Sequence, residues 1–117
     1  IKLLRECQYG LAGSAWIADY PDGDNFMQLL YGKNIADSNV ACYQSAAYDA
    51  LYEKTQYMSD SPQRDHLYDI MNKIVIADTP WIFGDTRIRN RLTQRYIKGF
   101  KPHPVLQTEW RYLDIAQ

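Results

Sequence analysis

Long apolar stretches are absent from this 117-residue sequence. No run approaches the roughly 18 consecutive apolar residues that mark a membrane-spanning helix. An excess of charge of either sign is absent as well, because 13 Lys and Arg stand against 14 Asp and Glu, for a formal net charge of −1. No field of the whole chain therefore attracts nucleic acid or an anionic membrane.

Cysteine and histidine are scarce, with two of each. Cys7 and Cys42 have neither C-x-x-C spacing nor a histidine at zinc-ligand spacing, so no metal or other cofactor is predicted. The sequence leaves open whether they form a disulfide in an oxidising compartment or remain two buried free thiols. His66 and His103 lie in polar or proline-rich contexts, and no G-x-S-x-G elbow surrounds Ser14. Without a nucleophile–base pair, we predict no catalytic residue and no enzyme.

A starting methionine and a signal-peptide pattern are also missing, since the chain begins Ile1-Lys2-Leu3. We therefore expect a fragment or a processed segment of a longer protein. At this length the chain is one domain or less, able to bury about two-thirds of its unfolded surface. Ten tyrosines and three tryptophans are present. Exposed clusters of such large aromatic side chains usually mark a contact surface.

Strand and turn signals fill the first third of the chain. Residues 8–18 are small and apolar with two glycines, which would cost a helix about 2 kcal/mol, so we predict a strand. Residues 19–25 contain a proline, an Asp-Gly pair and an asparagine, which predicts a turn. One or two helical turns are expected over residues 26–31, stopped by Gly32. Residues 32–44 are predicted to be irregular.

Two helices are predicted in the middle of the chain. The first follows a Ser45 N-cap, and the second begins at Ser61-Pro62, where proline suits the first helical position. The second should end before Pro80, because a residue that precedes proline disfavours the helical region. Apolar side chains recur at helical spacing in both. In the first helix these positions are Tyr48, Leu51, Thr55 and Met58, and in the second they are Leu67, Ile70, Met71, Ile74 and Val75.

The residues after Pro80 alternate in polarity. Period two over residues 86–92 predicts a strand with arginine on one face, and residues 110–115 predict a last short strand after a turn at 99–104. The element order indicates a mixed α/β or α+β fold. The basic residues are interpreted as a solvated or salt-bridged face, with a nucleic-acid or protein interaction module as the alternative. They are Arg87, Arg89, Arg91, Arg95, Lys98 and Lys101.

Three acidic residues, Asp19, Asp22 and Asp24, surround Gly23. A calcium loop is one interpretation, but a 12-residue loop from Asp19 would place proline at its third position and leucine at its twelfth. The other interpretations are a turn with solvated carboxylates, or a carboxylate that faces a cationic ligand.

Residues 16–20 span the end of the predicted strand and the start of the predicted turn. In an extended segment Trp16, Ala18 and Tyr20 share one face, whereas Ile17 and Asp19 share the other. A carboxylate at a strand end can accept charge-assisted hydrogen bonds from an ammonium group. An indole nearby offers an apolar wall or a cation–π face. The pattern has two interpretations: a buried tryptophan with a capping aspartate, which is commonplace, or a binding site for a cationic solute.

The run A-W-I-A-D-Y-P-D-G-D-N-F from Ala15 resembles a segment of the family 5 extracellular solute-binding proteins, which carry G-W-x-A-D-Y-P-D-P-x-N-F. Serine and alanine replace the glycine before Trp16, and Gly23 replaces the second proline of the pattern. Further matches follow in the same order. They are Tyr48-Asp49-Ala50-Leu51-Tyr52, Arg64-x-x-Leu67-Tyr68, and Ile74 to Asp78 before Pro80-Trp81-Ile82.

The resemblance implies the C-terminal portion of a two-lobed periplasmic-binding-protein type II fold. Residues 1–80 would belong to the C-terminal ligand-binding lobe, and residues 81–117 would return to the N-terminal lobe. In peptide-binding members the aspartate that matches Asp19 accepts the α-ammonium group of the ligand, and the tryptophan that matches Trp16 lines the side-chain pocket. Ala18 and Tyr20 are expected as neighbours.

The function implied is the substrate-binding component of an ABC importer, which captures a peptide or a small amine-bearing solute. Its partners would be the permease subunits, with no nucleic acid, and its location would be periplasmic or extracellular, membrane-associated in the cell envelope. Without the other lobe, Trp81, Phe83 and Trp110 are expected to be exposed. We therefore expect the isolated segment to self-associate.

Overall fold

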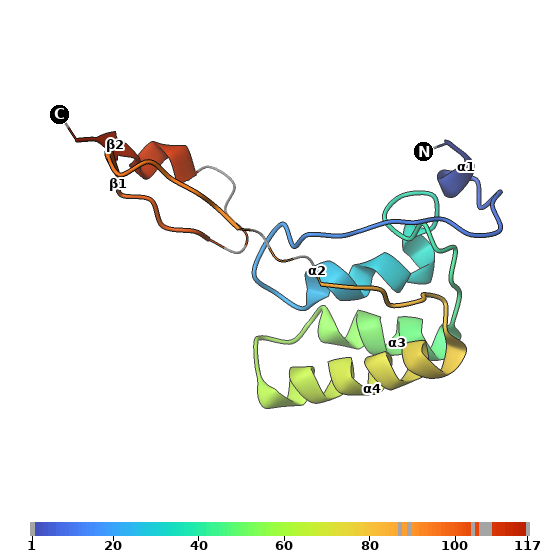
Figure 1. Ribbon diagram of the computed structural model, residues 1–117. Helices are drawn as coiled ribbons and strands as arrows, with labels where there is room; N and C mark the ends of the chain where they lie inside the picture. The colour runs from blue at the N-terminus through green and yellow to red at the C-terminus, as the bar shows by residue number, and fades with distance from the viewer. Residues whose placement is uncertain (1, 87, 89, 104, 106–108, 117) are drawn as a thin grey trace.

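A computed structural model describes residues 2–86, 88, 90–103, 105 and 109–116. A helical body occupies the middle of the chain, and a small C-terminal hairpin stands apart from it (Figure 1). The elements are α1 (Lys2–Arg5), α2 (Asp24–Met27), the 3₁₀ turns η1 (Gln28–Leu30) and η2 (Gly32–Asn34), α3 (Ala46–Thr55), α4 (Pro62–Asp78), β1 (Ile97–Lys98), η3 (Glu109–Tyr112) and β2 (Asp114–Ile115).

Capping residues define both long helices, as the sequence predicted. The Ser45 hydroxyl accepts the Tyr48 N–H at the start of α3, and the Ser61 hydroxyl accepts the Arg64 N–H at the start of α4. Each bond satisfies one N–H that has no partner within its helix. α4 ends at Asp78, and its C-cap Thr79, which precedes Pro80, has a left-handed φ of 50°.

The core lies where α3 and α4 pack on η1. Tyr48 and Met71 are fully buried, and the Tyr48 hydroxyl donates to the Met27 carbonyl over 2.7 Å. Burying each such side chain contributes about 1.5–3 kcal/mol. The remaining members of the buried cluster are Leu30, Tyr52, Tyr68 and Val75. The predicted faces are thus confirmed in part: Tyr48, Met71 and Val75 are buried, whereas the buried Tyr52 and Tyr68 lie outside the predicted positions.

Residues 35–43 are irregular, but buried hydrogen bonds fix them. The Asn39 side chain is fully buried, and its Nδ2 donates to the carbonyls of Tyr31 and Tyr43 at 3.0 and 2.9 Å. Its Oδ1 accepts the Tyr43 N–H. One side chain thereby replaces the backbone partners that regular structure would supply.

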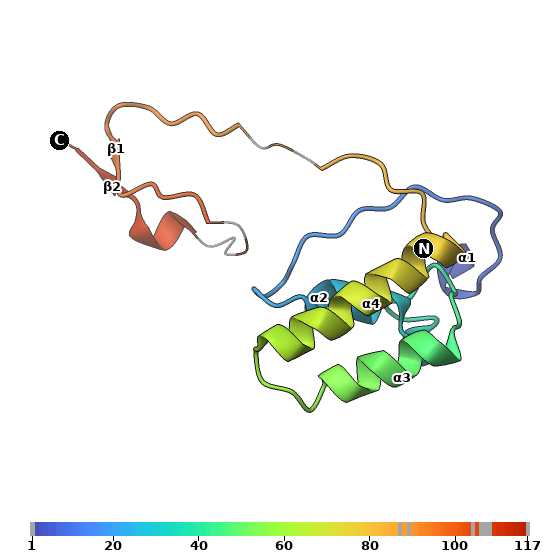
Figure 2. The ribbon, with the colours of Figure 1, turned by 90° about the horizontal axis from the view of Figure 1, so that it is seen from below.

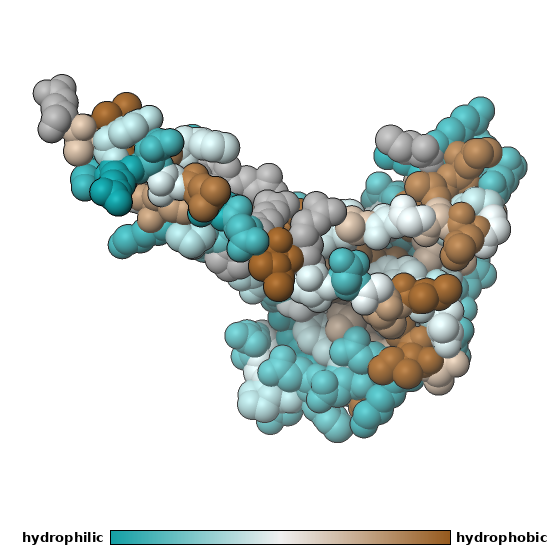
Figure 3. All heavy atoms as spheres, in the orientation of Figure 1, coloured by the Kyte–Doolittle hydropathy of each residue, from teal (hydrophilic) through white to brown (hydrophobic). Residues whose placement is uncertain are grey.

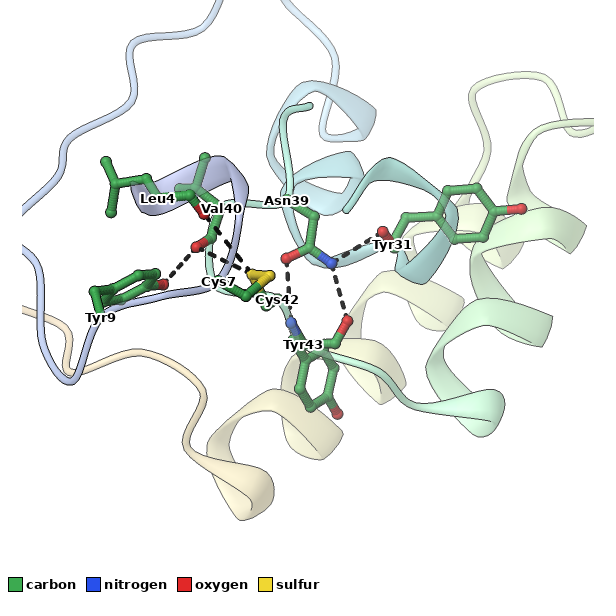
Figure 4. Close-up of a disulfide and its surroundings, with 8 residues drawn as sticks. All are labelled: Leu4, Cys7, Tyr9, Tyr31, Asn39, Val40, Cys42 and Tyr43. Atoms are coloured by element: carbon green, nitrogen blue, oxygen red, sulfur yellow. Dashed lines mark hydrogen bonds between the residues drawn. A yellow bond between two sulfur atoms is a disulfide. The ribbon is translucent and has the colours of Figure 1, made fainter. Parts of the chain in front are cut away.

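A disulfide joins Cys7 to Cys42 and attaches the N-terminal segment to this loop (Figure 4). The sequence had left this pairing open. The Tyr9 hydroxyl donates to the Val40 carbonyl beside it. The disulfide closes a separation of 35 residues, so α1 is held by the loop and contributes no buried side chain of its own.

The strand prediction for residues 8–18 was wrong for this chain. These residues run extended above α2 and are not paired into a sheet (Figure 1). A strand requires a neighbour for its N–H and C=O groups. The described part of the chain supplies none here. The predicted turn is confirmed up to Gly23, but α2 already begins at Asp24, and Gly32 does not end the helical segment because η2 begins there.

The second strand prediction, over residues 86–92, was also wrong where the structure describes the chain. Residues 86, 88 and 90–92 are in no strand, whereas Arg87 and Arg89 lie outside the described residues. Of the predicted strand at 110–115, only Asp114–Ile115 pair, with Ile97–Lys98. The hairpin needs glycine at position 99, because φ is +75° and a Cβ would lie 2.1 Å from the Tyr112 carbonyl oxygen.

The molecule is more extended than its size predicts. Its radius of gyration is 18.3 Å. A compact domain of this length would have a radius of gyration of about 13 Å. The accessible surface is 9233 Å². A compact monomer of the same mass would expose about 6600 Å².

Figure 2 shows the hairpin beyond the helices, and Figure 3 shows apolar surface on both parts. The class is mixed helix and strand, as predicted. The helical body holds the packed core, so the candidate site is positioned by the helices and not by the hairpin.

Candidate ligand-binding site

Asn25 lies at the centre of the predicted site residues. Its side-chain oxygen accepts the Trp16 indole N–H over 2.7 Å and the Asp19 backbone N–H over 3.1 Å. Asn25 is fully buried in α2, one helical turn before Leu29. The structure therefore brings the indole and the main chain of Asp19 onto a single buried acceptor.

The Asp19 carboxylate itself faces solvent. Among the described residues it has no hydrogen-bond or ion-pair partner, and the residue is exposed. The Trp16 side chain is 42% exposed, so its ring is partly available although its N–H is occupied. An exposed carboxylate and a half-exposed indole, on residues that share the Asn25 acceptor, offer the two kinds of group that an ammonium ligand with an apolar substituent needs.

Ala18 and Tyr20 border these two residues along the chain. Ala18 is half-buried, and Tyr20 is 39% exposed with its hydroxyl donating to Asp24 Oδ2 over 2.6 Å. Burial and then the hydrogen bond to this carboxylate raise the pKa of Tyr20. Tyr20 therefore stays neutral and is oriented toward the turn.

Asp22 connects the turn to α4. Arg64 Nη1 donates to Asp22 Oδ2 over 2.7 Å, and the guanidinium lies 5.1 Å from the centre of the Tyr68 ring. The hydrogen bond from Arg64 is the main reason that the pKa of Asp22 is lowered. Asp22 is thus structural, since it neutralises an arginine that is only 9% exposed.

Asp24 connects the same turn to α3. Its Oδ1 accepts a hydrogen bond from Gln56 Nε2 over 2.6 Å, and its Oδ2 accepts the Tyr20 bond. Burial alone would raise the pKa of Asp24, but the hydrogen bonds from Tyr20, Gln56 and Tyr52 outweigh it, so the pKa is lowered. Of the three acidic residues, only Asp19 is therefore left without an internal partner in the described part of the chain.

A metal site is not formed by these carboxylates. Among the described residues no group of three or more His, Cys, Asp or Glu side chains could hold an ion. His66 lines a shallow, open hollow of about 370 Å³ between the end of α3 and the start of α4, with Lys54, Met58 and Leu67. This hollow contains none of the predicted site residues.

Sequence reasoning missed Asn25, Gln56 and Arg64. Asn25 lies in the predicted turn at 19–25, and Arg64 belongs to the family-like run Arg64-x-x-Leu67-Tyr68, which predicts no role for its side chain. Nothing in their spacing shows that Asn25 is buried or that Arg64 reaches across 42 residues to Asp22. Only the packing of α2 on α3 and α4 creates these contacts.

No helix among the described residues is long and apolar enough to cross a membrane. No family model matches the chain, and no solved structure matches it significantly. Curated proteins do match. The chain is 28% identical over 99 residues to the probable deoxycholate-binding periplasmic protein YgiS of Escherichia coli (strain K12), which covers 85% of this chain and 18% of that protein.

Two further relatives match a shorter stretch. Heme-binding protein A of Haemophilus influenzae is 35% identical over 68 residues, covering 57% of this chain and 12% of that protein. Di/tripeptide-binding protein 3 of Pseudomonas aeruginosa is 35% identical over 66 residues, which cover 56% of this chain and 12% of that protein. Each is named as a binding protein, and the chain spans less than a fifth of the length of any of them. The predicted resemblance to solute-binding proteins is thus confirmed: the chain is similar to binding proteins, one of them named as periplasmic, over a small part of their length.

Proposed function

We propose that this chain is part of the substrate-binding component of an ABC importer, and that it contributes the anchor for the ammonium group of a peptide or small amine-bearing solute. Asp19 accepts the ammonium hydrogen bonds, and Trp16 supplies the apolar wall. The observation that supports this most strongly is the exposed Asp19 carboxylate, unpartnered in the described chain, on a residue whose backbone shares the Asn25 acceptor with the half-exposed indole.

The relatives support a binding role and leave the solute open. Their names specify deoxycholate, heme and di- or tripeptides, and of these only the peptides carry an ammonium group. The choice of an amine-bearing solute therefore depends on Asp19. An anion such as deoxycholate would be repelled by an unpaired carboxylate at close range.

A periplasmic or extracellular location fits two observations. One relative is named as periplasmic, and the chain has a Cys7–Cys42 disulfide. Disulfides persist in an oxidising compartment. Association with the membrane through permease subunits belongs to the same proposal.

The division into lobes is also a proposal. Residues 1–80 belong to the ligand-binding lobe, and residues 81–117 return to the other lobe. The burial pattern supports this, because every fully packed apolar residue among those described lies between Leu29 and Val75.

Asp19→Asn in the complete binding protein tests the anchor. The carboxamide keeps the size but loses the charge, so affinity for free-amine peptides should fall at least about tenfold, the lower range for a charged hydrogen bond. Affinity for N-acetylated peptides should change little. Isothermal titration calorimetry measures both. Asp37→Asn, at an exposed loop position, serves as the control. Equal losses for both peptide classes would exclude the role of Asp19.

A further inference from the structure

We infer that Asn25 is the positioning residue of the site, since its one side-chain oxygen sets the place of both the Trp16 indole and the Asp19 main chain. The inference about ligand binding rests on the proposed function. The inference about positioning depends only on the contacts of this chain, so the two can fail separately.

The chemistry of the three groups fixes how Asn25 is oriented. An indole N–H and a backbone N–H can only donate, so the atom that faces them must be the side-chain oxygen and not the amide nitrogen. The oxygen lies 2.7 Å from Trp16 Nε1 and 3.1 Å from the Asp19 nitrogen. Both distances are those of good hydrogen bonds. No water competes for this oxygen, because Asn25 is fully buried.

The segment before Asp19 has few other attachments. Residues 10–18 make one hydrogen bond to the rest of the described chain, and it is the one from Trp16 to Asn25. Tyr9 holds the preceding end through the Val40 carbonyl. An extended run without a sheet partner is otherwise free to shift, so Asn25 determines where the indole lies.

Asn25 is itself held firmly. It lies in α2, and Leu29 and Leu30 in the next turn are buried at 5% and 2% exposure. Asp24 beside it is bonded to Gln56 of α3, and Asp22 is bonded to Arg64 of α4. Asn25 therefore attaches the two proposed ligand-binding residues, Trp16 and Asp19, to the helical core.

Nuclear magnetic resonance of the ¹⁵N-labelled chain tests the positioning. Asn25→Ala removes the acceptor, so the Trp16 indole proton should shift upfield and its hydrogen exchange should accelerate about fivefold or more, the factor for one net hydrogen bond. The Asp19 amide should change in the same way. Asn25→Asp keeps an acceptor oxygen and should preserve both signals.

Asn39→Ala is the control, because Asn39 is equally buried and its side chain makes three hydrogen bonds, but to Tyr31 and Tyr43. It should leave the Trp16 and Asp19 signals unchanged. If Asn25→Ala does not fold, hydrogen exchange in the unmodified chain is the test. The Trp16 indole proton should exchange more slowly than the indole proton of Trp110, which is 72% exposed. Unchanged signals in Asn25→Ala, or equally fast exchange of the two indoles, would overturn the inference.

Binding in the complete protein tests the link to the ligand. Asn25→Ala should lower the affinity for free-amine peptides, and Asn25→Asp should keep at least part of that affinity. If the signals shift in Asn25→Ala while peptide affinity stays the same, the positioning holds and the ligand site proposed at Trp16 and Asp19 is wrong.

Discussion

At the scale of single residues, the three acidic side chains of one turn have separate roles. Asp22 and Asp24 are bonded to α4 and α3, whereas the Asp19 carboxylate has no partner within the described residues. A polar surface turn would give all three the same solvated environment. The difference arises because Arg64 and Gln56 approach from helices distant in sequence.

The stability of the turn should depend on pH. The pKa values of Asp22 and Asp24 are lowered in the folded chain. Their charged forms therefore stabilise the fold above the ordinary carboxyl pKa, near about 4. This stabilisation is lost as the pH falls through the lowered values. Urea unfolding should therefore show a decreasing free energy below about pH 4.

Asp22→Asn should lower the free energy of unfolding at pH 7 by about 1–3 kcal/mol, because it leaves the buried Arg64 unneutralised. Asp22 is 35% exposed. The lower part of the range allows for the solvent that reaches it. The loss should shrink at pH 3. Asp69→Asn, on the exposed face of α4, should have little effect at either pH. A loss that is the same at pH 7 and pH 3 would contradict the assignment.

At the scale of elements, α3 and α4 follow from local signals. Both N-caps, the proline at the start of α4 and the stop before Pro80 agree with the sequence prediction.

Ser61→Ala should lower the free energy of unfolding in urea by about 1 kcal/mol, because the Arg64 N–H loses its partner. Ser59→Ala provides the control: it lies outside the helix, and its bond to Ser61 uses only its carbonyl.

The disulfide holds the N-terminal element and the loop around Cys42, which are 35 residues apart. In the chain-entropy account, closing a loop of this length stabilises the fold by about 3–4 kcal/mol. Reduction should lower the free energy of unfolding by up to that amount and release residues 2–9, while the helical signal of α3 and α4 in circular dichroism remains. Reductant should have no effect on a Cys7→Ser/Cys42→Ser variant. Loss of the whole helical signal on reduction would show that the core depends on the disulfide.

At the scale of the whole molecule, the accessible surface is larger than that of a compact monomer of the same mass. Apolar side chains after Trp81 stay uncovered, and Phe83, Leu92 and Trp110 are 66%, 98% and 72% exposed. The expectation that Trp81 would also be exposed was wrong, because it packs partly against the helical core. We expect another part of the complete binding protein to cover the remaining apolar surface.

The chain should therefore self-associate, because large apolar patches seldom stay bare. Sedimentation equilibrium at micromolar concentration should give a mass above the 13.7 kDa of one chain. Phe83→Ser with Trp110→Ser should shift the distribution toward monomer, whereas Tyr57→Ser, at an isolated position that is 92% exposed, should not. A clean monomer of the unmodified chain would show that these side chains are tolerated in water.

The sequence by itself determined α3 and α4, their N-caps, the turn that begins at residue 19 and the likeness to solute-binding proteins. These depend on nearest neighbours and on short residue patterns, which a sequence displays directly. The pairing of strands could not be predicted, because residues 8–18 and 86–92 have strand composition but a strand forms only where another strand is available. Only the tertiary structure decided that Asn25 holds Trp16 and Asp19 together, because burial of an asparagine depends on which helices pack over it.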